Sequence, residues 1–300
     1  MNGTAIQDTP IAVDIWTRRV CLKSRLFFLS HAHADHTQGL TSSWTKYKIY
    51  CSEITKRILM HKLNVNEDLL VALPLGEPVV LPLDEEGREM LTVTLLDANH
   101  CPGAVMFLFE GYFGTILYTG DFRFKPAMLL HESLKGKQID KLYLDNTYCH
   151  PSCNFPTKTK TMKLIFDIIR RRLGDDIIIP LRTLGKEDLL VKIALEFNCW
   201  IGVTPKKMEL LKWLDLPDVF TSEWHKTQII VAQHPVNSYT LSQFRDPFVI
   251  LPTALYEGEK SNPYRHLPNY VTVPYSDHSS FKELLRFVSG IAPAEVIPLV

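Results

Sequence analysis

The sequence predicts an α/β fold, because three features of the chain indicate packed sheets and helices. The 300 residues are 46% hydrophobic, enough for a sizeable core in one large domain or two smaller ones. The first half alternates turns with short runs rich in Val, Ile, Leu, Phe and Tyr, the pattern of β-strands. The second half alternates helical and strand-like segments, which favours βαβ units and a parallel sheet.

The expected elements follow one another along the chain. Strands are predicted in the first half over residues 25–30, 48–52, 91–98, 104–111, 114–121 and 141–147. A helix is expected over 52–63 with Ser52 as its N-cap, and Gly111 and Gly114 have the spacing of a hairpin. The second half is expected to contain a helix over 158–174, a strand over 175–181, a helix over 186–197 and a strand over 248–253. The Pro-containing segment 149–160 is the natural boundary between the halves.

Composition and charge exclude several classes of protein. No run of 18 or more apolar residues occurs, and the start MNGTAIQDTP lacks a basic leader and an apolar h-region, so we expect an intracellular protein without a membrane segment. The 33 basic and 33 acidic residues balance, so no global field indicates a polyanionic partner. Residues 151–212 hold twelve Lys and Arg against seven Asp and Glu, which fits either a solvated surface or contact with a phosphate backbone.

The six cysteines show no dense framework spacing, which favours free thiols in a reducing compartment. Cys149 and Cys153 of the segment CHPSC could in principle bind a metal. One short pair without a second pair is weak evidence for such a site.

The segment 29–40, LSHAHADHTQGL, concentrates metal-binding side chains. Residues two apart in an extended stretch point the same way, so His31 and His33 can face one point, and the turn that follows brings Asp35 and His36 beside them. Imidazole and carboxylate groups suit zinc and similar ions. Four such groups in six residues exceed what one tetrahedral zinc needs from a single loop, so the segment predicts two neighbouring ions with further ligands from elsewhere.

Further ligand-type residues stand at the ends of predicted strands. They are Asp14, His100, Asp121, Asp145 and His278. Any one of them alone indicates little, because a lone aspartate at a strand end is usually a turn former and a lone histidine is usually structural. Together with the HxHxDH pattern they predict loops that converge on one edge of a sheet sandwich.

The motifs HAHADH, NHCPG, TGDFR, LDNT and PYSDHSS resemble those of the metallo-β-lactamase/β-CASP family of nucleases, and the resemblance covers almost the whole chain. It implies an α/β fold in which a metallo-β-lactamase αββα sandwich carries an inserted α/β β-CASP cap domain. The sandwich is expected over residues 1–155 and 271–300, and the cap over 156–270. The implied activity is hydrolysis of phosphodiester bonds that depends on one or two zinc ions or other divalent cations.

The resemblance also carries site residues over by position. One metal ion is expected on His31, His33, His100 and Asp121, and a second on Asp35, His36, Asp121 and His278. Asp14 and Asp145 match acids that support ligand histidines. The implied catalytic residues are therefore Asp14, Asp35, His36, Asp121, Asp145 and His278.

A phosphate pocket is implied on Thr183, Gly185 and Lys186 of the cap, together with Ser276. The first three of these lie between a predicted strand and a helix start, where free backbone N–H groups and the helix dipole favour an anion. Helix capping by Thr183 beside an exposed lysine explains the same loop without a ligand.

The substrate implied by the resemblance is DNA. Val300, 22 positions after His278, matches members that process DNA, whereas members that process RNA usually carry a histidine there. A monomeric 5′-to-3′ exonuclease acting on 5′-phosphorylated single-stranded ends is expected, in the nucleus, at telomeres and in crosslink repair. Docking on a telomere protein is expected only through a region beyond residue 300.

Three alternatives stay open. One is an RNA-processing β-CASP nuclease. A second is a small-molecule hydrolase of the wider fold, which the long insertion before His278 disfavours. The third is a metal-stabilised scaffold that binds DNA ends without cutting them.

Overall fold

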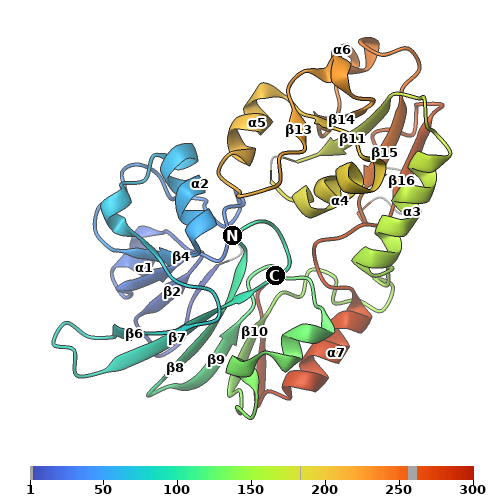
Figure 1. Ribbon diagram of the computed structural model, residues 1–300. Helices are drawn as coiled ribbons and strands as arrows, with labels where there is room; N and C mark the ends of the chain where they lie inside the picture. Colours follow the sequence, from blue (N-terminus) through green and yellow to red (C-terminus); the bar gives the residue numbers. More distant parts are fainter. Residues whose placement is uncertain (1–2, 183, 256–261) are drawn as a thin grey trace. The chain divides into compact units, whose positions relative to one another are not determined.

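The computed structural model in Figure 1 describes residues 3–182, 184–255 and 262–300. Packing divides the chain into two units. The first comprises the residues up to Asn154 together with His278–Val300, and the second comprises Phe155–Asp277. The assignment of 156–270 to a β-CASP domain stays a prediction. None of the described helices is both long and apolar enough to cross a bilayer.

Two sheets form the centre of the first unit. The strand order of one sheet is β1 (Thr4–Ala5), β2 (Ile11–Val13), β3 (Leu26–Phe28), β4 (Ile49–Cys51) and β5 (Leu70–Ala72). The order of the other is β17 (Glu295–Pro298), β10 (Lys141–Leu144), β9 (Gly114–Tyr118), β8 (Val105–Gly111), β7 (Met90–Asp97) and β6 (Pro78–Pro82). The six strands predicted in the first half are all present. The predicted hairpin is also confirmed, since Gly111 pairs with Gly114.

Helices cover the outer faces of both sheets. The helical segments of this unit are α1 (Arg18–Cys21), α2 (Glu53–Leu63), α7 (Phe281–Ile291) and the 3-10 turns η1 (Glu67–Leu69), η2 (Pro126–Leu130) and η3 (Glu132–Leu134). Ser52 is the N-cap of α2, as predicted, and its hydroxyl accepts the Thr55 N–H at 3.2 Å.

Three apolar clusters hold these layers together. Between the sheets, the Phe28 ring of β3 packs edge-on against Phe107 and Phe109 of β8, with centroids 5.3 and 4.9 Å apart. Leu59 of α2 is buried on the outer face of the first sheet, and Phe287 of α7 on that of the second. The first unit is therefore the predicted αββα sandwich.

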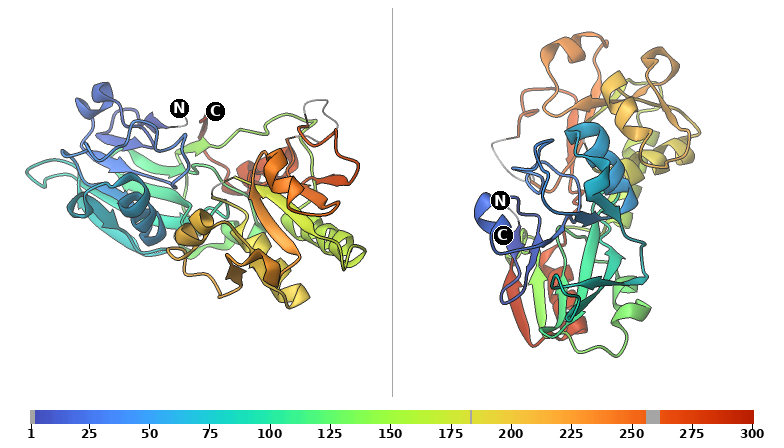
Figure 2. Two further views of the ribbon diagram at one scale, coloured as in Figure 1. Left: turned by 90° about the horizontal axis from the view of Figure 1, so that it is seen from above. Right: turned by 90° about the vertical axis from the view of Figure 1, so that its left-hand side faces the viewer.

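The second unit is built on one parallel sheet, as the βαβ pattern predicts. Its strand order is β13 (Phe220–Thr221), β12 (Ile201–Gly202), β14 (Ile229–Gln233), β11 (Ile177–Leu181), β15 (Phe248–Pro252) and β16 (Tyr270–Val273). The helical segments are α3 (Lys158–Arg170), α4 (Glu187–Phe197), α5 (Pro205–Leu211), α6 (Ser238–Ser242) and η4 (Trp224–Lys226). The longer helices α3 and α4 flank this sheet (Figure 2).

Two predicted strands end three residues earlier than expected. β9 stops at Tyr118 rather than residue 121, because Gly120 has a φ of 50°, outside the β region. β10 stops at Leu144, and Asp145 then accepts the Thr147 N–H at 3.0 Å in a side-chain turn. Both strands end early because their last predicted residues form loops that carry ligand-type side chains.

Candidate metal centre

Strand polarity in the first unit explains why distant ligand-type residues meet. β7 and β9 both run antiparallel to β8, and β10 runs parallel to β9, so β7, β9 and β10 end at the same edge of the sheet. His100, Asp121 and Asp145 follow these three ends. His31 and His33 follow β3 of the facing sheet. The loops that carry these polar residues therefore lie at one edge of the sandwich, here called the rim, as the strand-end pattern predicts.

The Asp121 carboxylate is the centre of this rim. Its Oδ2 lies 3.7 Å from His31 Nε2, 3.6 Å from His100 Nε2 and 3.8 Å from His278 Nε2. Its Oδ1 lies 3.4 Å from His36 Nε2. The two oxygens of this carboxylate thus face the Nε2 atoms of four histidines, and the place of Asp121 in both expected metal sites stays a prediction.

Three histidines form one group of possible ligands. His33 Nδ1 lies 3.0 Å from His31 Nε2 and 3.2 Å from His100 Nε2. Ligand atoms at about 2.0–2.1 Å from a tetrahedral zinc lie about 3.3 Å apart, so these ring nitrogens have the spacing of ligands on one cation. Cys101 Sγ comes within 4.8 Å of the same group. Cys101 is not among the predicted ligands, because its place beside His100 is the only feature of the sequence that marks this thiol.

A second and a third group share Asp121. One combines it with His31 and His36, and the other with His100 and His278. Asp35 belongs to none of the three groups found among the described residues. Its side chain is 55% exposed, and its Oδ2 lies 3.9 Å from His36 Nε2. Of the seven predicted metal ligands, the structure therefore gathers six closely and leaves Asp35 at the border.

Asp14 lies directly behind His36. His36 Nδ1 lies 2.8 Å from Asp14 Oδ2, which also accepts the Ser30 hydroxyl at 2.6 Å. The other oxygen, Oδ1, accepts the Ser30 N–H at 2.7 Å. Asp14 is 1% exposed and has a φ of 56°. A proton held on His36 Nδ1 by this carboxylate leaves Nε2, the atom that faces Asp121, able to bind a cation.

Asp145 supports His278 in the same way. Asp145 Oδ2 lies 2.8 Å from His278 Nδ1, and Oδ1 accepts both the N–H and the hydroxyl of Thr147, at 3.0 and 2.6 Å. The turn that shortens β10 thus orients this carboxylate. Both predicted supporting acids contact the ligand histidine nearest to them in the proposed second site.

The protonation of the cluster follows from burial and from these carboxylates. Burial and the neighbouring histidines hold the pKa of His31 well below its usual value, so His31 is neutral. Burial also opposes the charge of His36, but Asp14 and Asp121 outweigh it and hold the pKa of His36 well above its usual value. Burial would raise the pKa of Asp121, whereas its hydrogen bond to His36 and the charges of His36 and His278 hold it well below the usual value. The centre therefore presents an ionised carboxylate among imidazole nitrogens, a donor set suited to divalent cations.

The residues predicted for a phosphate pocket lie in the second unit. Lys186 Nζ lies 2.9 Å from Asp277 Oδ2, and Asp277 directly follows the buried Ser276. A Cβ added to Gly185 would lie 3.9 Å from the same Asp277 oxygen, so Gly185 also borders this carboxylate. Thr183 lies outside the described residues. The structure therefore brings Gly185 and Lys186 to the residue beside Ser276.

The backbone of this loop differs from the expectation of free N–H groups. The Gly185 N–H donates to Glu187 Oε2 at 2.8 Å, and Glu187, the first residue of α4, is fully buried. Glu187 also pairs with Lys207. The anion at this helix start is thus a side chain of the helix itself. The positive groups beside Asp277 are lysine side chains, which include Lys158, a residue that the sequence analysis did not select.

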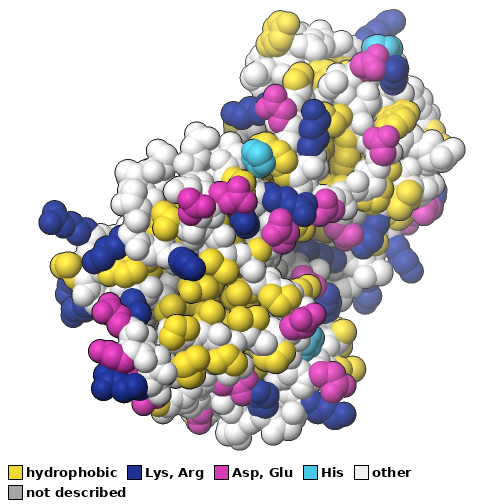
Figure 3. Space-filling view, turned by 60° about the vertical axis from the view of Figure 1, so that its left-hand side comes forward, with side chains coloured by type: hydrophobic (Ala, Val, Ile, Leu, Met, Phe, Trp, Pro, Cys, Tyr) yellow, Lys and Arg dark blue, Asp and Glu magenta, His cyan; other side chains and the backbone are white. Residues whose placement is uncertain are grey.

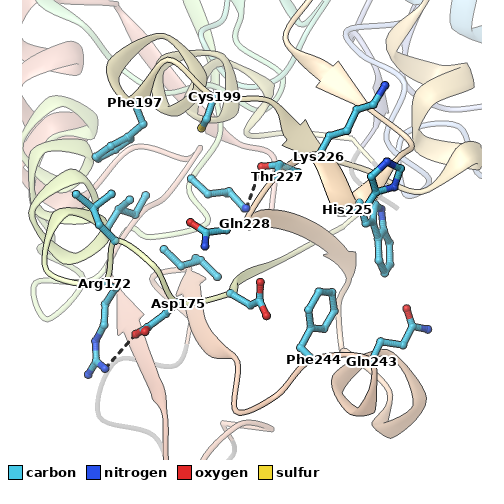
Figure 4. A pocket seen from close by; sticks show the side chains of 16 residues that line it. Arg172, Asp175, Phe197, Cys199, His225, Lys226, Thr227, Gln228, Gln243 and Phe244 are labelled. Carbon is cyan, nitrogen blue, oxygen red and sulfur yellow. Dashed lines mark hydrogen bonds and ion pairs between the residues drawn. The ribbon is translucent and has the colours of Figure 1, made fainter.

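A cavity of about 710 Å³ lies elsewhere in the second unit (Figure 4). It is lined by the first residues of β11 and β14, together with side chains such as Arg172, Phe197 and Phe244. Ligands of parallel sheets usually bind at the carboxyl ends of the strands, whereas this cavity lies at the amino ends. Among the predicted site residues that the structure describes, none lines it. On the surface in Figure 3, acidic and basic side chains are interspersed, in keeping with the balanced composition.

The sequence of this chain is similar to those of proteins named as nucleases and as DNA repair proteins. Residues 215–300 match the family model described as DNA repair metallo-beta-lactamase. The 5′ exonuclease Apollo of Mus musculus is 48% identical over 305 residues, covering all of this chain and 55% of the relative. Apollo of Gallus gallus is 46% identical over all of this chain and 64% of the relative. The DNA cross-link repair protein SNM1 of Arabidopsis thaliana is 31% identical, over 97% of this chain and 64% of the relative.

The chain thus spans a little over half the length of the first of these relatives. Among solved structures, a protein of unknown function from Enterococcus faecalis V583 has a TM-score of 0.64 at 16% identity. The match covers 92% of this chain and 76% of that protein. At this level of identity the likeness supports the fold alone.

Proposed function

We propose that this chain is a member of the DNA repair metallo-β-lactamase family and a metal-dependent 5′-to-3′ exonuclease that hydrolyses phosphodiester bonds of DNA from 5′-phosphorylated ends. The observation that carries the proposal is the Asp121 carboxylate, which faces the Nε2 atoms of four histidines at 3.4–3.8 Å. A centre so rich in imidazole and carboxylate groups is typical of hydrolytic metal sites.

Zinc is the proposed cation, with one or two ions per chain. The donor set fits it, because imidazole nitrogen and carboxylate oxygen are its usual partners besides thiolate. His31, His33, His100 and Asp121 would hold one ion, and Asp35, His36, Asp121 and His278 the other. When bound, the ions supply positive charge that stabilises a phosphodiester under attack and makes water a nucleophile at neutral pH.

The protein's own contribution is orientation and proton placement. Asp14 and Asp145 hold His36 and His278 by their Nδ1 atoms, so both rings present Nε2 to Asp121. Four of these side chains are almost fully buried, and burial fixes their rotamers before a substrate arrives. They are Asp14, His36, Asp121 and Asp145. Asp35, at 55% exposure, is the acid of the centre most accessible to solvent and substrate.

Selection of the 5′ end is proposed for the pocket of Thr183, Gly185, Lys186 and Ser276. A terminal phosphate monoester carries about −1.5 to −2 charges at pH 7, because its second pKa is near 6. A 5′-hydroxyl end offers no such group, so a lysine favours the phosphorylated end. The position of Lys186 beside Asp277 supports a charged pocket in the second unit.

The cellular role is proposed from the relatives. The protein is proposed to be a monomer that acts in the nucleus, at telomeres and in crosslink repair. The printed names of the relatives, 5′ exonuclease and DNA cross-link repair protein, support the role in crosslink repair. Docking on a telomere protein would use a region beyond residue 300.

The test is a nuclease assay on single-stranded oligonucleotides with a 5′-phosphate or a 5′-hydroxyl, in DNA and RNA versions, with and without a chelator. We expect shortening of 5′-phosphorylated DNA from its 5′ end, loss of activity with chelator and recovery on adding zinc. The double variant Asp35→Ala and His36→Ala is expected to be inactive. Cutting that survives chelation would contradict the metal mechanism, binding without cutting would favour the scaffold, and a preference for RNA would favour the RNA-processing alternative.

A further inference from the structure

Resting on the proposed function, we propose that Lys158 is a second cation of the phosphate pocket and that Asp277 holds Lys158 and Lys186 directed at one point. Lys158 would then determine, with Lys186, how strongly the protein prefers a 5′-phosphate over a 5′-hydroxyl end.

Three segments of the second unit converge at this point. Lys158 is the first residue of α3, Lys186 precedes α4, and Asp277 follows β16. Lys158 Nζ lies 2.9 Å from Asp277 Oδ1, and Lys186 Nζ lies 2.9 Å from Asp277 Oδ2. Each ammonium group contacts a different oxygen of one carboxylate. A single carboxylate therefore holds both positive charges near each other.

The same two ammonium groups lie near one aromatic ring. Lys158 Nζ is 5.8 Å and Lys186 Nζ 5.9 Å from the centroid of the Tyr275 ring. Tyr275 is 2% exposed, so its ring is a fixed surface near both lysines. Carboxylate and ring together restrict the two flexible side chains, which lowers the entropy lost when a ligand binds them.

Burial argues against a purely stabilising ion pair. The side chains of Lys158, Lys186 and Asp277 are 19%, 23% and 9% exposed. Charged groups this far from solvent lose hydration, and their mutual attraction need not offset that loss, so such a pair is weak evidence for a stabilising role. Among these three side chains the formal charge is +1. A phosphate monoester, with close to two negative charges, interacts with a pair of ammonium groups far better than a hydroxyl does.

Gly185 leaves room beside this carboxylate. Its φ of 114° suits glycine, and the position where a Cβ would stand is 3.9 Å from Asp277 Oδ2. Since the Gly185 N–H is engaged by Glu187, recognition of the phosphate charge falls on the lysine side chains rather than on this amide.

The matched variants are Lys158→Gln, which removes the charge at similar length, and Lys158→Arg, which keeps it. Lys160→Gln, two residues along the same helix at an exposed position, is the control. Binding of fluorescent single-stranded DNA with a 5′-phosphate or a 5′-hydroxyl is measured in chelator, so that no cutting occurs. Binding of inorganic phosphate is measured separately by titration, and KM and kcat are measured with metal.

We expect Lys158→Gln to lower the binding preference for the 5′-phosphate about tenfold and to weaken binding of inorganic phosphate, as loss of one charge-assisted hydrogen bond does. The effect on catalysis should fall on KM rather than kcat. Lys158→Arg should restore most of the preference, and Lys160→Gln should match the wild type. An unchanged preference in Lys158→Gln overturns the inference, as does equal weakening for both ends with a lower melting temperature, which marks a structural role.

The two proposals fail in different ways. If the wild type binds inorganic phosphate through Lys158 but does not cut DNA, the proposed function is wrong and the pocket stands. If the wild type cuts with a 5′-phosphate preference that Lys158→Gln retains, the exonuclease stands and Lys158 has no part in its selectivity.

Discussion

Replacement of Asp14 by asparagine should disable one metal site although it barely changes the shape of the side chain. Asp14 Oδ1 accepts the Ser30 backbone N–H at 2.7 Å, and a backbone N–H can only donate. The oxygen of the new amide must therefore occupy the Oδ1 position, and its NH₂ group must face His36 Nδ1, 2.8 Å away in the native protein. His36 Nδ1 then has to accept, so the ring proton moves to Nε2.

The misplaced proton is the source of the effect. His36 Nε2 is the atom that lies 3.4 Å from Asp121 Oδ1, and a protonated nitrogen cannot bind a cation. Loss of a residue that supports a ligand histidine costs about 10–100-fold in metal affinity, or about 1.4–2.7 kcal/mol. Since Asp14→Asn inverts the tautomer rather than merely freeing the ring, we expect the upper end of this range for the site of His36.

The assay is competition for zinc between the protein and a chromophoric chelator, with cutting of 5′-phosphorylated DNA measured in parallel. Asp167→Asn, which alters an exposed carboxylate paired with Arg170 in the second unit, is the matched control and should bind zinc as the wild type does. The tautomer reasoning is refuted if Asp14→Asn binds two ions with wild-type affinity.

Three further outcomes are expected. Asp121→Asn should lower the zinc affinity of both proposed sites by more than about 100-fold, the largest loss expected for a residue that only supports a ligand. The same competition assay measures it. Burial lowers the pKa of His36, but the larger opposite effect of Asp14 and Asp121 holds it well above its usual value. His36 is therefore protonated without zinc, and zinc must displace a proton to bind it. Affinity should therefore climb with pH until that raised pKa is passed, with proton release visible by calorimetry in two buffers, and a flat profile would contradict it. Glu187→Ala should lower the opening free energy of α4 by about 3–5 kcal/mol, because it removes the buried partner of Lys207, and hydrogen exchange of the α4 amides will show whether it does.

The parts of the fold that the sequence predicts well are those whose apolar runs are long. β7, β8 and α2 are recognisable because eight, seven and eleven consecutive residues keep one pattern. β1, β12 and β13 have two residues each, too few for any period to show. They are strands because a neighbouring strand offers hydrogen-bond partners, a tertiary fact that no local pattern contains.

The gathering of histidines at the candidate metal centre was predictable for a similar reason, and the surroundings of the proposed phosphate pocket were less so. The spacing of His31, His33 and His36 within one loop is a local signal. The neighbours of Lys186 come from segments near residues 158 and 277, and nothing in the sequence links those positions. The engagement of the Gly185 N–H by Glu187 likewise depends on a side chain folding back, which a loop pattern does not indicate.

Hydrogen bonds join residues 278–279 to the loop that carries Asp121. Arg123 donates to the His278 carbonyl at 3.0 Å, the Ser279 N–H donates to the Phe122 carbonyl at 3.1 Å, and the Phe124 N–H donates to the Ser279 hydroxyl at 2.9 Å. On the ribosome, Asp121 emerges long before these partners, because the entire second unit is translated in between. A nascent chain that has not yet reached His278 therefore lacks one of the six ligand-type residues gathered at this rim, so the candidate centre is completed only after the second unit has been synthesised.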